Sequence, residues 1–248
     1  NNVRQVVGPQ VNEQSLRKMV DQTFRNAARN YYDLWRLVSQ GPEAIRAAVH
    51  FLPKVWTHLE HALQRGKGVF IAGTHTGNFD LSVLALAAHG LEIQVLGLAA
   101  PPTGGFDLMD QMRAHAGVRL TSISLLALRE AISRLRAGGI VLTGVDRPVG
   151  HTGKEETEVE FFGRPAPLPT GHVRLALKTD AAVLVASPYR DPHRGNMVSL
   201  SPPLEMIRTG DPDEDLRVNL RHVTTWLERF IRARPEQWGM FVPVWQEL

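Results

Sequence analysis

A histidine and an aspartate stand five positions apart where a buried strand is expected to end. Residues 69–72 form an apolar run of strand length, followed by a turn that carries His75 and by an apolar helix beginning near Asn78. On one continuous helix, His75 and Asp80 would be separated by roughly 140° of arc. With His75 at the strand end and Asp80 in the first helical turn, the carboxylate can accept the Nδ1 proton. Nε2 is then free to take a proton from a substrate.

Such a pair activates a nucleophile, and here the nucleophile would be a hydroxyl group of the substrate. An alcohol reacts poorly at neutral pH, and a general base within about 3 Å is typically worth about 10²- to 10⁴-fold in rate. The amides of residues 76–78, at a helix start, are candidate donors to a developing oxyanion. The chain has no cysteine and no Gly-x-Ser-x-Gly string, which argues against a hydrolase that forms an acyl-enzyme.

A second candidate acid follows another buried strand. Residues 140–145 are mostly apolar and come directly after Gly138 and Gly139, and Asp146, Arg147 and Pro148 follow them. Strands alternate with helices along most of the chain, which predicts an α/β fold with a mixed, mainly parallel central sheet flanked by helices. Sites in such folds gather at the carboxyl ends of strands, so His75 and Asp146 are expected at the same edge. The alternative to a role in the site is a structural one, in which Asp146 forms a turn near Pro148 or caps a helix.

The elements are expected in one domain, 1–248, made of a helical arm (1–65) and an α/β core (66–248). We expect helices at 12–30, 31–39, 42–64, 78–89, 107–116, 125–137, 173–178 and 215–232, the last one capped by Asp213 or Asp215. We expect strands at 69–72, 91–98, 118–120, 140–145, 182–187 and 197–200, and an edge strand at 157–162.

The helical arm carries apolar and aromatic residues at helical spacing with basic residues among them. One interpretation is an amphipathic arm packed on the domain. The other is a helix lying on a membrane surface, with aromatic and basic side chains at the level of the headgroups. Both interpretations stay open.

Composition narrows the classes of function. The chain has 248 residues and no cysteine, which excludes disulfides and thiolate metal sites. Its net charge of +3 is too small for a dedicated nucleic-acid binder. No run of about 18 apolar residues is present, so no span is expected. A basic patch facing anionic lipid is compatible with this charge. The chain begins with Asn1, so an upstream anchor could precede it.

Three strings of this sequence carry a resemblance to a known family. The first is His75-Thr-Gly-Asn-Phe-Asp80, a His-x4-Asp pattern after a strand. The second is Phe-Phe-Gly at 161–163 with Pro-Thr-Gly before a helix, and the third is Pro-Glu-Gln-Trp at 235–238. Together they resemble the glycerolipid and lipid A acyltransferase superfamily, most closely its branch of late lipid A acyltransferases and phosphatidylinositol mannoside acyltransferases. We expect the segment around Trp238 to pack on the domain, and Phe161 and Phe162 to be core residues, with contact to an acyl chain as the alternative for this pair.

The resemblance implies roles for the acidic and histidine residues. His75 would be the general base and Asp80 would orient it. Asp146 would lie close to His75 and raise the pKa of the imidazole by favouring its cation. Arg147 would lie near the phosphates or the pantetheine of the acyl donor.

A basic rim around His75 is also expected. Arg113, Arg119 and Arg147 follow elements of the same sheet end. The family has an arginine between its first motif and the acidic strand end, and Arg113 is the first choice for it, with Arg119 the second. Thr76 and Asn78 are expected to contact substrate.

The function expected from this resemblance is a membrane-surface acyltransferase. It would move a fatty acyl group from acyl-CoA or acyl carrier protein, used as co-substrate without a further cofactor or metal, to a hydroxyl of a glycolipid or lysophospholipid. The sequence does not choose between these donors or acceptors. We expect a peripheral location at the cytoplasmic face of the plasma membrane.

Two alternatives come from other classes. One is a metal-dependent hydrolase that binds a cation through His75, Asp80 and Asp146. Such a site would usually contain a second histidine at ligand spacing, and His89, His115 and His151 are scattered in the sequence without such a pair. The other is a non-catalytic lipid-binding protein that keeps the fold.

Overall fold

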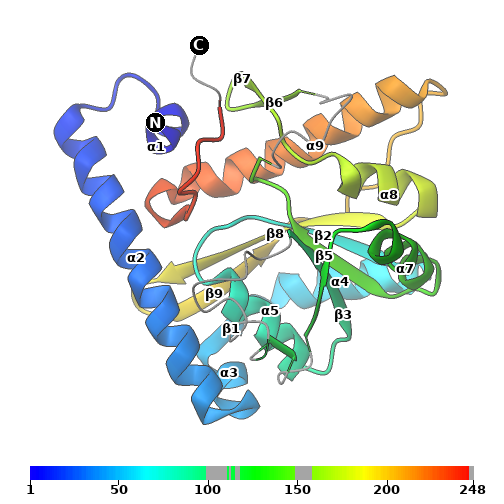
Figure 1. The fold of residues 1–248 in the computed structure, drawn as a ribbon, viewed down its shortest axis with the longest axis horizontal. Helices are drawn as coiled ribbons and strands as arrows, with labels where there is room; N and C mark the ends of the chain where they lie inside the picture. The colour runs from blue at the N-terminus through cyan, green and yellow to red at the C-terminus, as the bar shows by residue number, and fades with distance from the viewer. Residues whose placement is uncertain (99–110, 112, 115–117, 149–157, 246–248) are drawn as a thin grey trace.

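A mixed sheet forms the centre of the molecule. The computed structural model describes residues 1–98, 111, 113, 114, 118–148 and 158–245. Within them a seven-stranded sheet runs in the order β1-β9-β8-β2-β5-β3-β4 (Figure 1). Its strands are β1 (Val49–Phe51), β2 (Val69–Gly73), β3 (Ile93–Gly97), β4 (Arg119–Ser122), β5 (Ile140–Gly144), β8 (Ala182–Asp191) and β9 (Gly195–Leu200). The β8–β9 hairpin is antiparallel and the other pairs are parallel, which confirms the predicted fold class.

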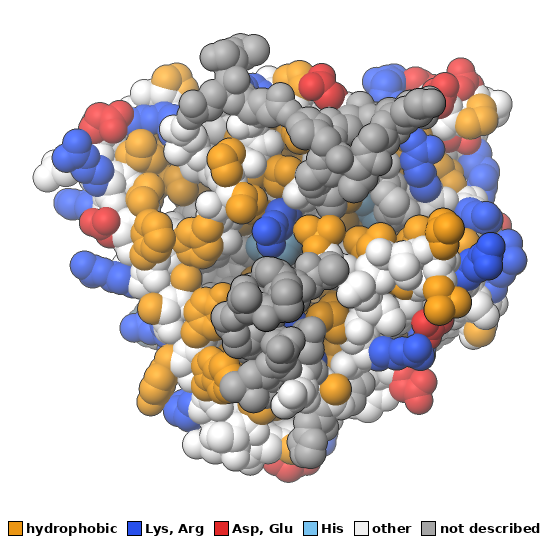
Figure 2. Space-filling view, viewed as in Figure 1, with side chains coloured by type: hydrophobic (Ala, Val, Ile, Leu, Met, Phe, Trp, Pro, Cys, Tyr) orange, Lys and Arg blue, Asp and Glu red, His pale blue; other side chains and the backbone are white. Residues whose placement is uncertain are grey.

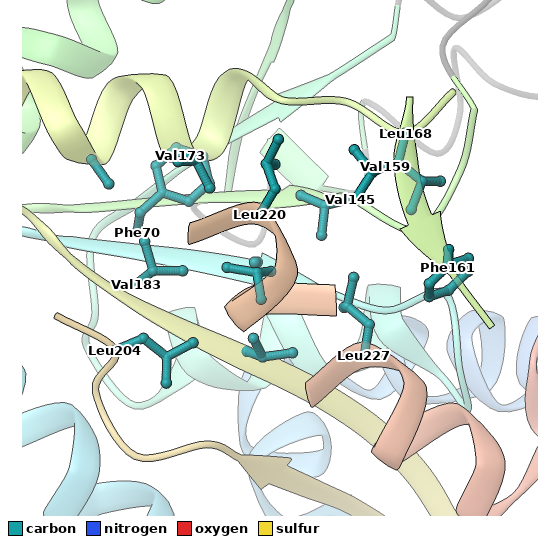
Figure 3. Packing of buried hydrophobic residues seen from close by; sticks show 14 of the residues in the cluster. Phe70, Val145, Val159, Phe161, Leu168, Val173, Val183, Leu204, Leu220 and Leu227 are labelled. Carbon is teal, nitrogen blue, oxygen red and sulfur yellow. The ribbon is translucent and has the colours of Figure 1, made fainter. Parts of the chain in front are cut away.

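Helices cover both faces of this sheet. One face packs on α7 (Leu125–Arg136), α8 (Gly171–Thr179) and α9 (Pro212–Ala233), and the other on α4 (Pro53–Gln64) and α5 (Phe79–Ala88). Strand β2 shows why two faces form: Phe70 and Ala72 enter the first core, whereas Val69 and Ile71 enter the second. Figure 3 shows Phe70 and Val183 of the sheet beneath Val173 of α8. Because β2 is buried on both faces, its whole length is apolar.

The N-terminal arm contains one continuous helix where two were expected. After α1 (Asn2–Val7), a single helix α2 (Glu13–Gln40) runs along one side of the molecule (Figure 1). Its N-cap Asn12 accepts a hydrogen bond from the backbone N–H of Ser15. The predicted division into 12–30 and 31–39 is wrong, since no glycine or proline interrupts the helix before Gly41.

The predicted helix 42–64 is also wrong. It divides into α3 (Pro42–Ala48), the short strand β1 and α4. Pro53 occupies the first turn of α4, where a backbone N–H would have no partner within the helix, so the missing N–H of proline costs nothing. Inside a longer helix, Pro53 would clash with the preceding turn. Strand β1 pairs with β9, a partner far away in the sequence, so local pattern could not reveal it.

Other boundaries shift by a few residues. Strand β6 (Val159–Phe161) pairs with β7 (Arg164–Ala166) in a separate two-stranded sheet and is not an edge of the main one. Helix α9 is capped by Asp211, not by Asp213 or Asp215, and the short 3-10 helix η1 (Pro235–Gln237) follows it. The predicted helix 107–116 lies largely outside the described residues. Phe161 and Phe162 are buried, as predicted.

Candidate active site

The register of two neighbouring strands brings the candidate residues together. Gly73 and Gly144, the last residues of β2 and β5, are directly paired. The backbone N–H of Val145 extends the ladder by donating to Gly73 O at 3.0 Å. His75 and Asp146 each follow their strand end by two residues, so they lie side by side at the carboxyl edge of the sheet.

Asp146 holds the imidazole of His75. Its Oδ1 lies 2.5 Å from His75 Nδ1, and its Oδ2 accepts the backbone N–H of His75 at 2.8 Å. The Asp146 side chain is fully buried, whereas 22% of the His75 side chain is exposed. Because a carboxylate can only accept here, Nδ1 carries the proton and Nε2 is the basic nitrogen. Among the described residues, none is hydrogen-bonded to Nε2.

Asp80 does not fill the position expected for it. Its Oδ1 accepts two hydrogen bonds from Arg113, from Nε at 3.0 Å and from Nη2 at 2.5 Å. The predicted hydrogen bond between His75 Nδ1 and Asp80 is therefore wrong, and Asp146 takes its place. The reason is positional: Asp80 is the second residue of α5, whereas Asp146 comes from the strand paired with β2. The arginine predicted to belong to the site, Arg113, is the partner of Asp80.

The charges around His75 raise the pKa of its imidazole above 6.5. Burial is the largest single influence and lowers this pKa, but the charge of Asp146 and its hydrogen bond raise it, and together they outweigh the burial. Arg147 lowers the pKa to a smaller extent and Asp80 raises it slightly. The predicted effect of Asp146 is thus confirmed in direction.

Two neighbours fix the plane of the imidazole ring. A Cβ at Gly144 would lie 2.4 Å from His75 Cε1 and 2.9 Å from Nε2, so the ring lies directly against the backbone of that glycine. On another side, the ring of Phe79 meets the imidazole edge to face with 5.0 Å between the ring centroids. A side chain at position 144 would push the imidazole out of this place.

The turn after His75 is held by several distant segments. Gly77 has φ +49°, and a Cβ there would come within 2.7 Å of Tyr189 Cα. The Gly77 carbonyl accepts the side-chain amide of Asn30 on α2 at 2.6 Å, and its N–H donates to Gln237 O at 3.1 Å. Asn78 caps α5 by accepting from a backbone N–H, and its own amide donates to Asn30 O at 2.9 Å. The base therefore stands on a turn with little freedom.

Thr76 and Asn78 use their side chains within the protein. The Thr76 hydroxyl lies 2.9 Å from Ser187 Oγ and donates to Pro188 O at 2.7 Å, and both predicted substrate-binding residues are buried. The amide of Gly77 is occupied by Gln237 and is not available to an oxyanion. Contact between substrate and the other amides at the start of α5 stays a prediction.

Trp238 is a member of the site that sequence reasoning missed. Its Nε1–H donates to Asp146 Oδ2 at 2.8 Å across 92 positions of sequence, and its ring is 1% exposed. The prediction that this segment packs in the core is confirmed, but the indole also binds the carboxylate behind His75. Pro235, Gln237 and Trp238 were recognised as a string, and nothing local in that string indicates a partner in the β5 turn.

The predicted basic rim is only partly assembled. Arg147 is exposed next to Asp146, and Arg113 forms an ion pair with Asp80. Arg119 is level with Phe70 in the sheet register, about 10 Å short of the end of β2 at about 3.3 Å per residue, and it pairs with Glu130 at 2.6 Å. Its predicted position near His75 is wrong, because it begins its strand instead of following it.

The histidines considered as further metal ligands lie elsewhere or outside the described residues. His89 packs against the rings of Phe51 and Trp56 at 5.5 and 5.0 Å, beyond the far end of α5. His115 and His151 belong to segments that are not described. In the part of the chain that the structure covers, no group of three or more His, Asp or Glu side chains could hold a metal ion.

Comparison with known proteins points to one family. A model of bacterial lipid A biosynthesis acyltransferases matches residues 1–247. The chain is also similar to a phosphatidylinositol mannoside acyltransferase of Mycobacterium tuberculosis, found in strains CDC 1551 / Oshkosh and ATCC 25618 / H37Rv, at 26% identity over 191 residues. That alignment covers 76% of this chain and 58% of each relative, so the chain spans well under two thirds of the length of these relatives.

Proposed function

Because the chain belongs to the bacterial lipid A biosynthesis acyltransferase family, we propose that it moves a fatty acyl group from a thioester to a hydroxyl of a glycolipid or lysophospholipid, with His75 as general base. The observation that carries the proposal is the hydrogen bond that His75 Nδ1–H donates to Asp146, which leaves Nε2 as the basic atom of a ring that is 22% exposed. Asp146, and not Asp80, orients the base.

In the proposed reaction one proton moves from the acceptor hydroxyl to His75 and then from His75 to the leaving thiolate. His75 Nε2 takes the proton of the acceptor hydroxyl as its oxygen attacks the thioester carbonyl, and a tetrahedral oxyanion forms. When the carbon–sulfur bond breaks, the imidazolium returns the proton to the departing thiolate. The carboxylate of Asp146 stabilises the imidazolium between these steps, which agrees with the raised pKa of His75.

The donor would be held by cationic side chains at the rim of the site. Arg147 is exposed and close enough for its charge to act on His75, so it is the candidate for contact with the phosphates that acyl-CoA and the arm of acyl carrier protein share. Arg113 is bonded to Asp80 and would act through that pair. Both donors present the same pantetheine thioester, and the proposal covers either one.

Action at a membrane surface is supported by the exposed side of α2. Phe24, Tyr31 and Trp35 recur at helical spacing and are 59%, 60% and 40% exposed, and Tyr32 beside them is 65% exposed. Arg25, Arg29 and other basic residues flank them. Figure 2 shows hydrophobic side chains gathered along the side of the molecule formed by α2. Aromatic and basic side chains on one helix suit the headgroup region of an anionic lipid layer.

The same helix also reaches the site. Asn30, directly before Tyr31, bonds to the turn that carries the base, so the same stretch of α2 carries the exposed aromatic residues and a support of the site. Among the described helices, none is long and apolar enough to cross a bilayer. Because exposed aromatic and basic side chains on α2 suit a lipid surface, we propose a peripheral location at the cytoplasmic face of the plasma membrane.

Mass spectrometry of lipid products tests the reaction. The protein is incubated with a long-chain acyl-CoA, or with acyl carrier protein carrying the same chain, and a lysophospholipid, a phosphatidylinositol mannoside or a lipid A precursor. We expect one of these acceptors to gain an acyl group, and His75→Ala to lower the yield about 10²- to 10⁴-fold with an unchanged fold. An acylation that survives a chelator counts against the metal-dependent alternative. Failure of every combination would refute the proposed function.

Co-sedimentation with anionic vesicles tests the membrane surface. We expect Tyr31→Ser with Trp35→Ala to weaken partitioning at least about tenfold, since burying one large apolar side chain contributes about 1.5–3 kcal/mol. Ile207→Ser removes a side chain of similar exposure, 46%, from a loop before α9 and serves as the control. Equal partitioning of the double variant and the control would place the membrane contact elsewhere.

A further inference from the structure

We propose that Trp238 is a positioning residue for the reaction: its indole N–H fixes the carboxylate of Asp146, and through it the imidazole of His75. This inference rests on the proposed function. The observation behind it is the 2.8 Å hydrogen bond from Trp238 Nε1 to Asp146 Oδ2, between two side chains that are 1% and 0% exposed.

The indole completes the set of donors around the carboxylate. Oδ1 binds Nδ1 of His75, and Oδ2 binds the backbone N–H of His75 and the indole N–H. Two of these three donors belong to His75 itself, so among the described residues the indole is the donor that ties the carboxylate to another part of the molecule. Because Asp146 is fully buried, water cannot replace a lost donor without a rearrangement.

The backbone around Trp238 holds the same turn. The N–H of Gly239 donates to His75 O at 2.8 Å, and Gln237 O accepts the N–H of Gly77 at 3.1 Å, which makes a short antiparallel bridge between Trp238 and Thr76. The backbone of the segment after α9 is therefore hydrogen-bonded to the chain at His75 and at Gly77, while the Trp238 side chain is hydrogen-bonded to Asp146.

Packing alone does not account for the orientation of Trp238. Its ring lies in an aromatic cluster with Phe161, Phe162 and Trp245, at centroid distances of 6.2 to 6.3 Å. Trp245 stacks on Phe161 in the same cluster, but its Nε1–H donates to the carbonyl of Phe161 at 3.2 Å. The two tryptophans share burial and neighbours, and they differ in what their N–H binds.

This difference supplies a matched pair of variants. Trp238→Phe and Trp245→Phe each remove one buried indole N–H and a similar volume from one cluster. We expect Trp238→Phe to lower kcat about tenfold or more with little change in KM, on the scale of one hydrogen bond to a charged group. Trp245→Phe should keep kcat within about twofold of wild type, because its lost bond does not reach Asp146.

A spectroscopic reading separates this inference from the proposed reaction. In proton NMR spectra the Nδ1–H of His75 reports its bond to Asp146 whether or not a substrate is known. We expect this resonance to move upfield and broaden in Trp238→Phe and to stay in place in Trp245→Phe. Should Trp238→Phe fold poorly, β-(3-benzothienyl)alanine at position 238 keeps the shape of the side chain and lacks the N–H. An unmoved or downfield resonance, or equal losses of kcat in both tryptophan variants, would overturn the inference.

Discussion

Replacing Asp146 by asparagine should disable the base without changing the shape of the site. The carboxylate accepts three N–H groups and donates none. An asparagine amide has one oxygen, and placed where Oδ2 is, that oxygen can keep the backbone N–H of His75 and the indole N–H of Trp238. Its NH₂ group then faces Nδ1 of His75, and two donors cannot bond. The imidazole must move its proton to Nε2, the atom that has to receive the proton of the substrate.

The expected loss in kcat is about 10³- to 10⁴-fold, or about 4–5.5 kcal/mol in the activation free energy. The same exchange behind the catalytic histidine of serine proteases costs about 10⁴-fold for the same reason, a wrong tautomer. The assay is the steady-state formation of acylated lipid, with thermal unfolding measured in parallel. The pKa of His75 should fall as well, since the charge and the hydrogen bond of Asp146 both raise it.

Asp80→Asn is the control for this experiment. Asp80 is bonded to Arg113 and contributes the smallest of the influences on the pKa of His75, so its amide variant should keep the tautomer and the pH profile of wild type. A kcat of Asp146→Asn within about threefold of wild type, or a loss of kcat confined to Asp80→Asn, would refute the assignment of Asp146 as the partner of the base.

Three further outcomes are expected. Gly144→Ala should lower kcat by at least about tenfold with a native circular-dichroism spectrum, because its Cβ would lie 2.4 Å from His75 Cε1; wild-type activity would show that the ring is not confined there. In wild type, kcat/KM should decline on acidification with an apparent pKa above 6.5, since the base must be neutral and its pKa is raised; a limb below 6.5 contradicts this. Burial lowers the pKa of His172 to about 4, so the unfolded chain binds a proton at this residue more readily than the folded protein does, and the free energy of unfolding should drop by about 3 kcal/mol between pH 6.5 and 4. His172→Phe should lose that part of the pH dependence in urea titrations. An unchanged pH dependence would count against this role of His172.

Local pattern was sufficient to predict the strands that carry the site. The apolar run before His75 and the one before Asp146 have no polar alternation because β2 and β5 are covered by helices on both faces. Strands β2 and β5 each end two residues before His75 or Asp146, and parallel strands in one sheet then place both residues at one edge. The α/β class and the position of Asp146 near His75 could therefore be predicted before any coordinates.

Interactions between distant segments could not be predicted in the same way. Strand β1 exists because β9 offers it a parallel partner, and its three residues carry no strand signal of their own. Trp238 reads as a core aromatic from its type alone, and its bond to Asp146 spans 92 positions. Arg119 looked close to the site in sequence order, but its position at the start of β4 places it short of the strand ends.

The choice between the two acids shows why spacing is a weak guide to a proton relay. Asp80 is the nearer acid in sequence, yet Arg113 neutralises its charge, and 16% of its side chain is exposed. Asp146 is fully buried, and its hydrogen-bonding partners are His75 and the neutral indole of Trp238. A buried carboxylate keeps most of its field for the group it touches, whereas a carboxylate paired with a guanidinium has little left for an imidazole farther away. Of the charged groups around His75, Asp146 in the turn after β5 therefore acts most strongly on its proton affinity, and the charge of Asp80 at the start of α5 is taken up by Arg113.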